Sequence, residues 1–225
     1  MELTKHTYCI GTQRCEAYAA AEPQALLVQM TSSHQSEELQ SEAAAITAAG
    51  VPFVLLAVCV DDWEYDLMPW PEPAVSRRPE VGLGAEKTLQ FVVGELLPTL
   101  PWRHLPVVLG GYSLGGLFAL WTSRQTGVFQ AIAAASPSLW AGDWPTYAER
   151  YPSNARLTYL SLGDREERSR NHTMARVGDR LRAEHNRLVN QLGADHTILV
   201  WEQGGHFADP AGRMARAFAW CLSRL

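Results

Sequence analysis

The serine Ser113 lies in the stretch GGYSLGG at residues 110–116, where four glycines surround it. An apolar run at 105–109 precedes this stretch, and another at 117–121 follows it. A surface loop rich in glycine and serine would have polar neighbours on both sides. The pattern therefore predicts a strand, a sharp turn and a helix, with the serine at the turn.

Residues 111–115 fit G-x-S-x-G, the turn that presents a nucleophilic serine between a strand and a helix. Glycine two residues before and after Ser113 is expected because a side chain there would collide with the neighbouring strand or helix. The helix start would direct free N–H groups at a developing oxyanion, and the N–H of Leu114 would be one donor. An inert serine in a tight turn could have the same five letters, but the strand and helix around it favour a catalytic serine.

A serine hydroxyl needs a base to act as a nucleophile at neutral pH. The chain has seven histidines, and in hydrolases with this turn the acid and then the histidine follow the serine. Of the four histidines after Ser113, His206 follows the last expected strand and is the predicted base. His172 lies in a polar loop, His185 within an expected helix, and His196 at the amino end of a strand.

Three acidic residues follow the expected strand at 157–162, namely Asp164, Glu166 and Glu167. Glu166 leaves room for a short turn before its carboxylate would face the histidine, so we expect it to be the triad acid. Asp164 could be the acid or could brace the turn. The remaining alternatives are Glu167 as the acid and a serine–histidine pair that works without an acid.

A second oxyanion donor is expected in the loop after the apolar run at 25–30. The backbone N–H of Thr31 or of Ser32 is the candidate, and we take Thr31. This loop lacks the HGGG form of lipase-like enzymes.

Short, continuously apolar runs alternate with amphipathic segments along the chain. Such runs are typical of strands buried on both faces, and the alternation predicts βαβ units with about six parallel strands in a three-layer α/β sandwich. Residues 7–20 are expected to add one or two antiparallel edge strands. The expected strands are 25–30, 53–60, 106–109, 131–135, 157–162 and 197–201, and the expected helices are 36–49, 85–97, 114–124, 174–192 and 211–222.

In open parallel sheets the site lies beyond the carboxyl ends of the strands. The segment 61–79 follows a strand, carries four prolines and shows no periodicity. It is either a stiff wall of the pocket or an ordinary surface excursion pinned by its prolines. Aromatic rings here and in the next loops could offer apolar surface to a substrate, and an aspartate could hold a polar group or close an Asx turn. The candidates for contact with substrate are Trp63, Asp66, Trp70, Tyr112 and Trp140.

The bulk composition fits one globular domain over residues 1–225, with little room for a lid domain. A net charge of −5 disfavours nucleic acid and anionic membranes as partners. The longest apolar run is too short to cross a bilayer, and the start of the chain lacks the apolar core of a signal peptide, so we expect a cytoplasmic protein. We find no metal-ligand spacing and expect no cofactor. The oligomeric state stays open.

Five segments occur in order, namely DLMPW (66–70), GGYSLGGLFAL (110–120), ASPSLW (135–140), YLSLGDREE (159–167) and GGHF (204–207). With these segments the chain resembles the Putative esterase family of α/β-hydrolases, which includes enterobactin-type siderophore esterases, esterase D and the antigen 85 mycolyltransferases. The resemblance covers roughly residues 50–215. It implies the α/β-hydrolase fold, and the family's serine, acid and histidine fall on Ser113, Glu166 and His206.

We therefore expect a serine hydrolase that cleaves carboxylic esters through a Ser-His-Glu/Asp triad and an acyl-enzyme intermediate. Its partner would be a small-molecule ester. A thioesterase, an amidase or an acyltransferase on the same fold is an alternative. A non-catalytic binding protein is a further alternative, but it would have no need of a serine, an acid and a histidine in this order.

Overall fold

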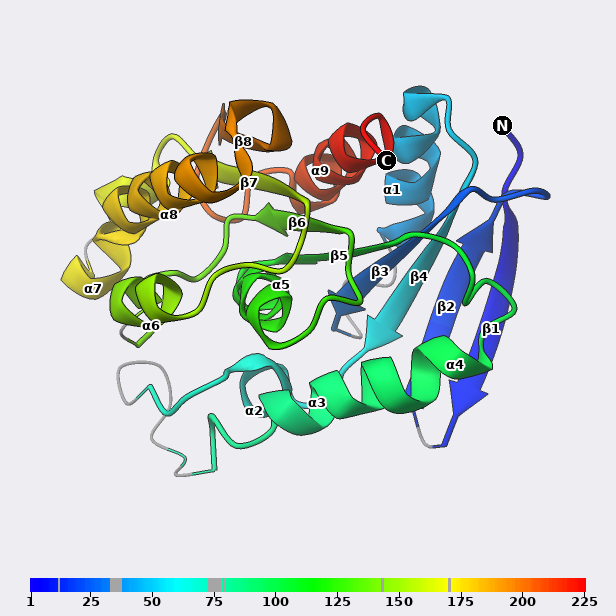
Figure 1. Cartoon of the computed structure of the whole chain (residues 1–225), viewed down its shortest axis with the longest axis horizontal. Helices are drawn as coiled ribbons and strands as arrows, with labels where there is room; N and C mark the ends of the chain where they lie inside the picture. Colours follow the sequence, from blue (N-terminus) through cyan, green and yellow to red (C-terminus); the bar gives the residue numbers. More distant parts are fainter. Residues whose placement is uncertain (12, 33–37, 73–77, 79, 143, 170) are drawn as a thin grey trace.

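An eight-stranded sheet runs through the molecule in the order β1-β2-β4-β3-β5-β6-β7-β8 (Figure 1). The computed structural model describes residues 1–11, 13–32, 38–72, 78, 80–142, 144–169 and 171–225. Strands β3 to β8 pair in parallel, and β1 and β2 join antiparallel at one edge, as the sequence predicts. The strands are β1 Thr4–Ile10, β2 Gln13–Ala19, β3 Ala25–Thr31, β4 Phe53–Cys59, β5 Val107–Tyr112, β6 Ala131–Ala135, β7 Leu157–Gly163 and β8 Thr197–Glu202.

Helices cover both faces of this sheet, which makes the fold the expected three-layer α/β-hydrolase sandwich (Figure 1). Helices α1 and α9 lie on one face, and α3, α5 and α8 lie on the other. In the part of the chain that the structure describes, no helix has the length and apolar character of a membrane span. The helices are α1 Leu39–Ile46, η2 Thr47–Ala49, α2 Trp63–Leu67, α3 Ala85–Phe91, η3 Val92–Leu96, α4 Leu97–Thr99, α5 Leu114–Gln125, α6 Trp144–Arg150, η4 Glu166–Arg168, α7 His172–Ala175, α8 Val177–Leu192, η5 Ala194–His196 and α9 Pro210–Leu222.

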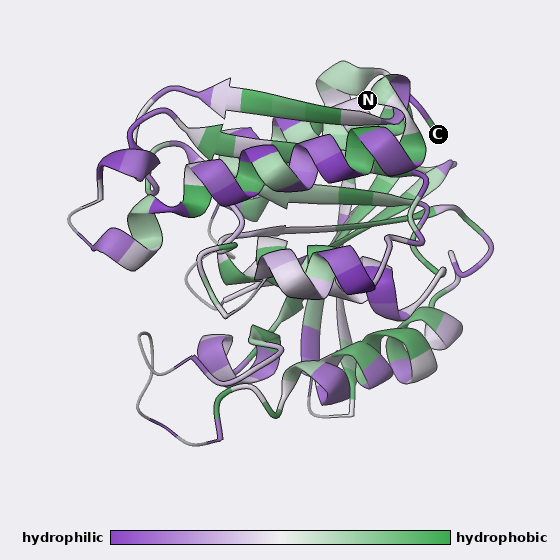
Figure 2. Cartoon of the chain, turned by 60° about the vertical axis from the view of Figure 1, so that its left-hand side comes forward, coloured by the Kyte–Doolittle hydropathy of each residue, from purple (hydrophilic) through white to green (hydrophobic). Residues whose placement is uncertain are grey.

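Apolar side chains on both faces of the strands form two cores. Along β4, Val54 and Leu56 belong to one core, whereas Phe53 and Leu55 belong to the other. The strands are accordingly mostly apolar, and the helices carry both apolar and polar residues (Figure 2). This burial on both faces explains why the strands read as continuous apolar runs.

The helix expected at 85–97 is not a uniform α-helix. After α3 the chain forms a π-helical turn, η3, before α4. Pro98 accounts for this, because it has no N–H to donate and its ring would press on the carbonyl one turn earlier. The wider turn relieves that conflict and ends with a bond from the N–H of Leu97 to the carbonyl of Val92.

Other boundaries also differ from the prediction. The segment expected as one helix at 174–192 divides into α7 and α8 at Arg176. Two helices were missed, α2 and α6, both too short to show a period. Asp62 begins α2 by accepting a hydrogen bond from the N–H of Tyr65. The first residues of the helix expected at 36–49 lie outside the described residues.

The register of the sheet brings four loops together at one edge. Tyr112 at the end of β5 lies beside Ala135 of β6, which lies beside Ser161 of β7. Gly163 at the end of β7 lies beside Glu202 of β8. Because these four neighbouring strands are parallel, the loops that follow them meet at their common carboxyl edge.

A buried carboxylate, Glu184 of α8, joins three helices on one face of the sheet. Its side chain is fully buried and pairs with Arg124 of α5. It also accepts hydrogen bonds from the indole N–H of Trp144 in α6, at 3.1 Å, and from Arg187, at 2.7 Å. The guanidinium of Arg124 stacks on the Trp144 ring. These contacts fix α8 against α5. Helix α5 follows Ser113, and α8 comes after the acidic loop, the segment after β7 that contains Asp164, Glu166 and Glu167.

Glu184→Gln keeps the shape of this side chain and leaves the buried Arg124 charge without its main partner. We expect the free energy of unfolding to fall by about 3–5 kcal/mol, measured by urea denaturation. The matched control is Asp179→Asn on the same helix, because the Asp179 side chain is 88% exposed beside Arg182 and its loss should not be measurable. Equally small losses in both variants would contradict this role of Glu184.

Candidate active site

Ser113 occupies the sharp turn between β5 and α5. Its φ of 58° lies in the left-handed region, which a serine enters only at a cost of about 1–3 kcal/mol. A side chain at Gly111 would come within 2.3 Å of the backbone of Gly115, so glycine is required there. At Gly115 itself the nearest atom would be Trp63 at 3.4 Å, an ordinary contact. The prediction that a side chain at position 115 would collide with its neighbours is therefore wrong, because the start of α5 leaves space there.

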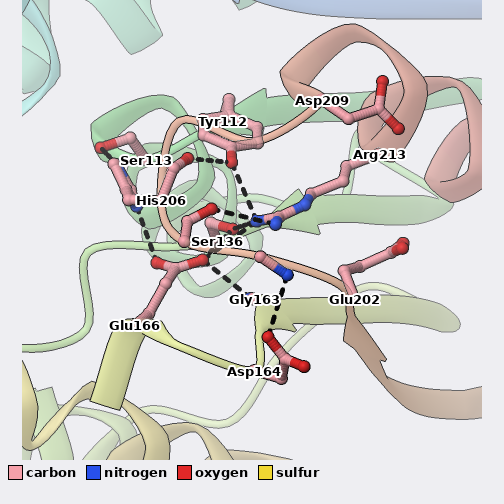
Figure 3. Close-up of polar contacts among 12 residues, drawn as sticks. Tyr112, Ser113, Ser136, Gly163, Asp164, Glu166, Glu202, His206, Asp209 and Arg213 are labelled. Carbon is pink, nitrogen blue, oxygen red and sulfur yellow. Dashed lines mark hydrogen bonds and ion pairs between the residues drawn. The ribbon is translucent and has the colours of Figure 1, made fainter. Parts of the chain in front are cut away.

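Hydrogen bonds link Ser113, His206 and Glu166 in one chain (Figure 3). Nε2 of His206 lies 3.0 Å from Oγ of Ser113, and Nδ1 lies 2.7 Å from Oε2 of Glu166. An ionised carboxylate can only accept, so Nδ1 carries the proton. Nε2 is then left to accept the hydrogen bond from the Ser113 hydroxyl.

The second carboxylate oxygen of Glu166 is held by three donors. The N–H of Gly163 and the hydroxyl of Ser136 each donate to Oε1 at 2.8 Å, and Arg213 donates at 3.0 Å (Figure 3). This division fixes the plane of the carboxylate and leaves Oε2 for His206. The side chain is only 5% exposed, so water does not compete for these bonds.

Glu166 remains a carboxylate in this setting. Burial alone would raise its pKa, but the hydrogen bond and charge of His206 and the donors from Gly163 and Ser136 outweigh burial. The net result is a pKa below the ordinary value of a glutamate. The Glu166 carboxylate is therefore suited to accept a hydrogen bond from the protonated Nδ1 of His206 and not to donate one.

Arg213 of α9 was missed in the sequence. Its side chain is completely buried, and besides Glu166 it donates to the carbonyls of Gln203 and Gly205 at 3.1 and 3.0 Å. One signal was available, because Arg213 stands four and eight residues before Ala217 and Cys221, on the buried stripe of α9. A charge on such a stripe must find a partner inside the protein.

Two further contacts hold the loop that carries His206. Asp164 accepts a hydrogen bond from the N–H of Gly204 at 2.9 Å, and the Tyr112 hydroxyl donates to the carbonyl of His206 (Figure 3). Asp164 thus braces the loop that carries His206, whereas the sequence suggested that it could brace its own turn after β7. Glu167, the third acid of the cluster, pairs with Arg182.

Ser138 also contacts Ser113 and was not singled out in the sequence. Its Oγ lies 3.2 Å from Oγ of Ser113, and its N–H donates to the Ser113 carbonyl at 3.1 Å. Only 1% of Ser138 is exposed. Its position in the segment ASPSLW, directly after β6, was the available signal.

A cavity of about 570 Å³ opens over Ser113 and His206, a size that suits a small organic ligand. Trp63 and Trp140, two of the candidates for contact with substrate, lie on its wall. Much of the cavity wall is apolar, and charged side chains also line it, among them Arg165 and Arg168.

The other three candidates lie away from the cavity lining that the structure describes. The ring of Trp70 packs against Tyr147, with centroids 5.3 Å apart. Asp66 accepts a hydrogen bond from the N–H of Asp62 at 2.9 Å, within α2 and its cap. Tyr112 is buried, and its hydroxyl is engaged behind the His206 loop. Each of these side chains is occupied by a protein partner that sequence spacing could not reveal.

The two predicted oxyanion donors differ in position. Leu114 lies on the cavity wall at the first position of α5, where the backbone N–H has no partner within the helix. Thr31 is the last residue of β3 and is buried, and its hydroxyl donates to the carbonyl of Val58. The end of β3 lies close to the start of α5, since the carbonyl of Met30 is 3.6 Å from the Cβ position of Gly115.

Comparison with known proteins gives a family and a fold. The profile of the family described as "Putative esterase" matches residues 31–207. No curated protein sequence matches the chain. Among solved structures, an IroE-like serine hydrolase from Shewanella oneidensis has a TM-score of 0.74 at 15% identity, over 97% of this chain and 79% of that chain.

Two further structures are similar at the level of the fold. The siderophore hydrolase EstA from Aspergillus nidulans has a TM-score of 0.66 at 18% identity, over 98% of this chain and 94% of its own. The enterobactin esterase FES from Shigella flexneri has a TM-score of 0.64 at 16% identity, and the match covers 97% of this chain but 59% of that chain. At these identities the likeness establishes the fold.

The lowered pKa of Glu166 predicts a pH-dependent contribution to stability. The unfolded value is about 4.3, so the stabilisation is fully present above that pH and is lost as the pH falls through the lower folded value. At neutral pH we expect Glu166→Gln to be less stable than the wild type by about 3 kcal/mol, because Arg213 loses its charged partner. Below about pH 4 this difference should close, as the wild-type side chain becomes neutral.

Urea denaturation of both proteins between pH 7 and 3 measures this difference. Glu167→Gln is the control, since Glu167 is partly exposed beside Arg182 and its removal should cost little at any pH. A gap between wild type and Glu166→Gln that stays constant down to pH 3 would show that the Glu166 carboxylate is not stabilised in the folded chain.

Proposed function

The chain belongs to the Putative esterase family and is a carboxylic ester hydrolase, and we propose that it cleaves esters through an acyl-enzyme formed on Ser113. His206 acts as the general base, and Glu166 orients it. The observation that carries this proposal is the unbroken hydrogen-bond chain from Glu166 through His206 to Ser113 beneath a cavity.

In the first step Oγ of Ser113 attacks the ester carbonyl, and its proton passes to Nε2 of His206. The imidazole becomes positive beside the Glu166 carboxylate, which is already ionised and held by Arg213. No side chain has to reorganise when this charge develops, and such preorganisation lowers the barrier. His206 then gives the proton to the departing alcohol, which leaves the acyl group on Ser113.

The negative carbonyl oxygen is stabilised by backbone donors. The N–H of Leu114 at the start of α5 supplies one, supported by its place on the cavity wall. The N–H of Thr31 is the second donor that we propose, and the closeness of the end of β3 to α5 supports it. A water molecule, activated by His206, then attacks the acyl-enzyme and releases the acid.

Ser138 assists the nucleophile in this scheme. The Ser113 hydroxyl gives its proton to His206, so its oxygen is free to accept from the Ser138 hydroxyl 3.2 Å away. This hydrogen bond favours the Oγ atom as negative charge develops on it. The two hydroxyls have different roles, because among the described contacts only the Ser113 hydroxyl lies within hydrogen-bond distance of the His206 imidazole.

A fluorophosphonate probe should form one adduct on the wild-type chain, read as intact mass, because only an activated serine displaces its leaving group. Ser113→Ala should form none and should lose at least three orders of magnitude of ester turnover. Ser138→Ala is the matched control, a second hydroxyl removed from the same cavity. It should still be labelled at one site, at a lower rate.

The same experiment can contradict the proposal. If the folded wild type takes no adduct, Ser113 is not activated, and the chain would be a binding protein on a hydrolase scaffold. If Ser113→Ala is labelled as fast as the wild type, the nucleophile is another residue.

A further inference from the structure

Two arginines border the cavity that contains the nucleophile. Arg165 and Arg168 follow β7, one on each side of the Glu166–Glu167 pair, and both line the cavity with Ser113. Both side chains belong to exposed residues. In the described part of the chain, neither guanidinium has an ion-pair or hydrogen-bond partner.

The cavity wall carries two cations that its carboxylates do not pair with. Its buried acid, Glu166, is already balanced by Arg213 at 3.0 Å. Its other carboxylate, Glu64, lies 3.2 Å from Arg78, a guanidinium that it shares with Asp62. Neither acid pairs with Arg165 or Arg168, so these two guanidinium groups are left to attract a ligand.

Most of the remaining wall is apolar. It includes Trp63 and Trp140 together with Met174 and Phe207. Phe207, next to His206, is 89% exposed, so its ring is open to contact with a ligand. A ligand that packs against these apolar side chains needs an apolar body of its own.

We propose that the preferred substrates are esters that carry a carboxylate. The ester carbonyl would lie at Ser113, the apolar body against the tryptophans and Phe207, and the carboxylate at Arg165 and Arg168. Guanidinium groups bind carboxylates through paired N–H donors, which fixes orientation as well as charge. This inference rests on the proposed function, since it assigns a substrate class to the same site.

Two matched pairs of substrates test it. The first pair is 4-nitrophenyl hydrogen glutarate and its methyl ester, which differ by a charge on the acyl side. The second pair is 4-acetoxybenzoate and its methyl ester, which differ by a charge on the alcohol side. We expect kcat/KM for the charged member of at least one pair to exceed that of the neutral member by about tenfold at low salt, and added salt to reduce this preference.

The double variant Arg165→Gln, Arg168→Gln should lower the charged-to-neutral ratio to near one. The backbone bond from the N–H of Arg165 to the carbonyl of Gly204 does not depend on the side chain, so the loop should keep its fold. Arg103→Gln is the matched control, because it removes an exposed arginine that precedes β5 at the opposite edge of the sheet. It should leave the ratio unchanged.

The inference is overturned if neither pair shows a preference for the charged ester, or if the double variant keeps the wild-type ratio. Hydrolysis of the neutral esters that depends on Ser113 would then leave the proposed function intact. If the folded wild type hydrolyses none of the four esters, the proposed function fails, and the substrate class fails with it.

Discussion

The buried ion pair between Arg213 and Glu166 is the contact on which the site depends. A fully buried guanidinium without a charged partner would cost several kcal/mol (about 3–5), so α9, the acidic loop and the His206 loop must be placed to satisfy it. Arg213 donates to Glu166 and also to the carbonyls of Gln203 and Gly205. One side chain thereby binds the Glu166 carboxylate and fixes the loop that presents His206.

Backbone strain is concentrated around the same contact. Among the described residues, three that are not glycine have a positive φ, namely Ser113, Ser136 and Asp209. Ser113 is the proposed nucleophile, Ser136 donates to Glu166, and Asp209 caps the helix that carries Arg213. Strained conformations persist only where the surrounding structure determines them. Here the sheet register and the buried ion pair supply that constraint at Ser113 and Ser136.

Apolar patterning was enough to predict the parallel strands, their alternation with helices along the chain and the turn at Ser113, because burial on both faces leaves continuous apolar runs. The order of serine, acid and histidine indicated residues that lie in contact. Partners across the fold were not predictable. Arg213 stands 47 residues from Glu166, and the ring that covers Trp70 comes from a helix too short to show a period. The π-helical turn before Pro98 was not predictable either, because it depends on the clash between the proline ring and the preceding turn, and the spacing of apolar residues does not reveal that clash.

The central claim is that a covalent acyl-enzyme forms on Ser113. The most direct measurement is rapid quenching of the wild type with excess 4-nitrophenyl ester, followed by intact mass and peptide mapping. The account predicts a burst of 4-nitrophenol that matches one acyl group per chain, located on the peptide that contains Ser113. An acyl group on Ser138 or elsewhere, or turnover with no acylated protein at any time, would contradict it.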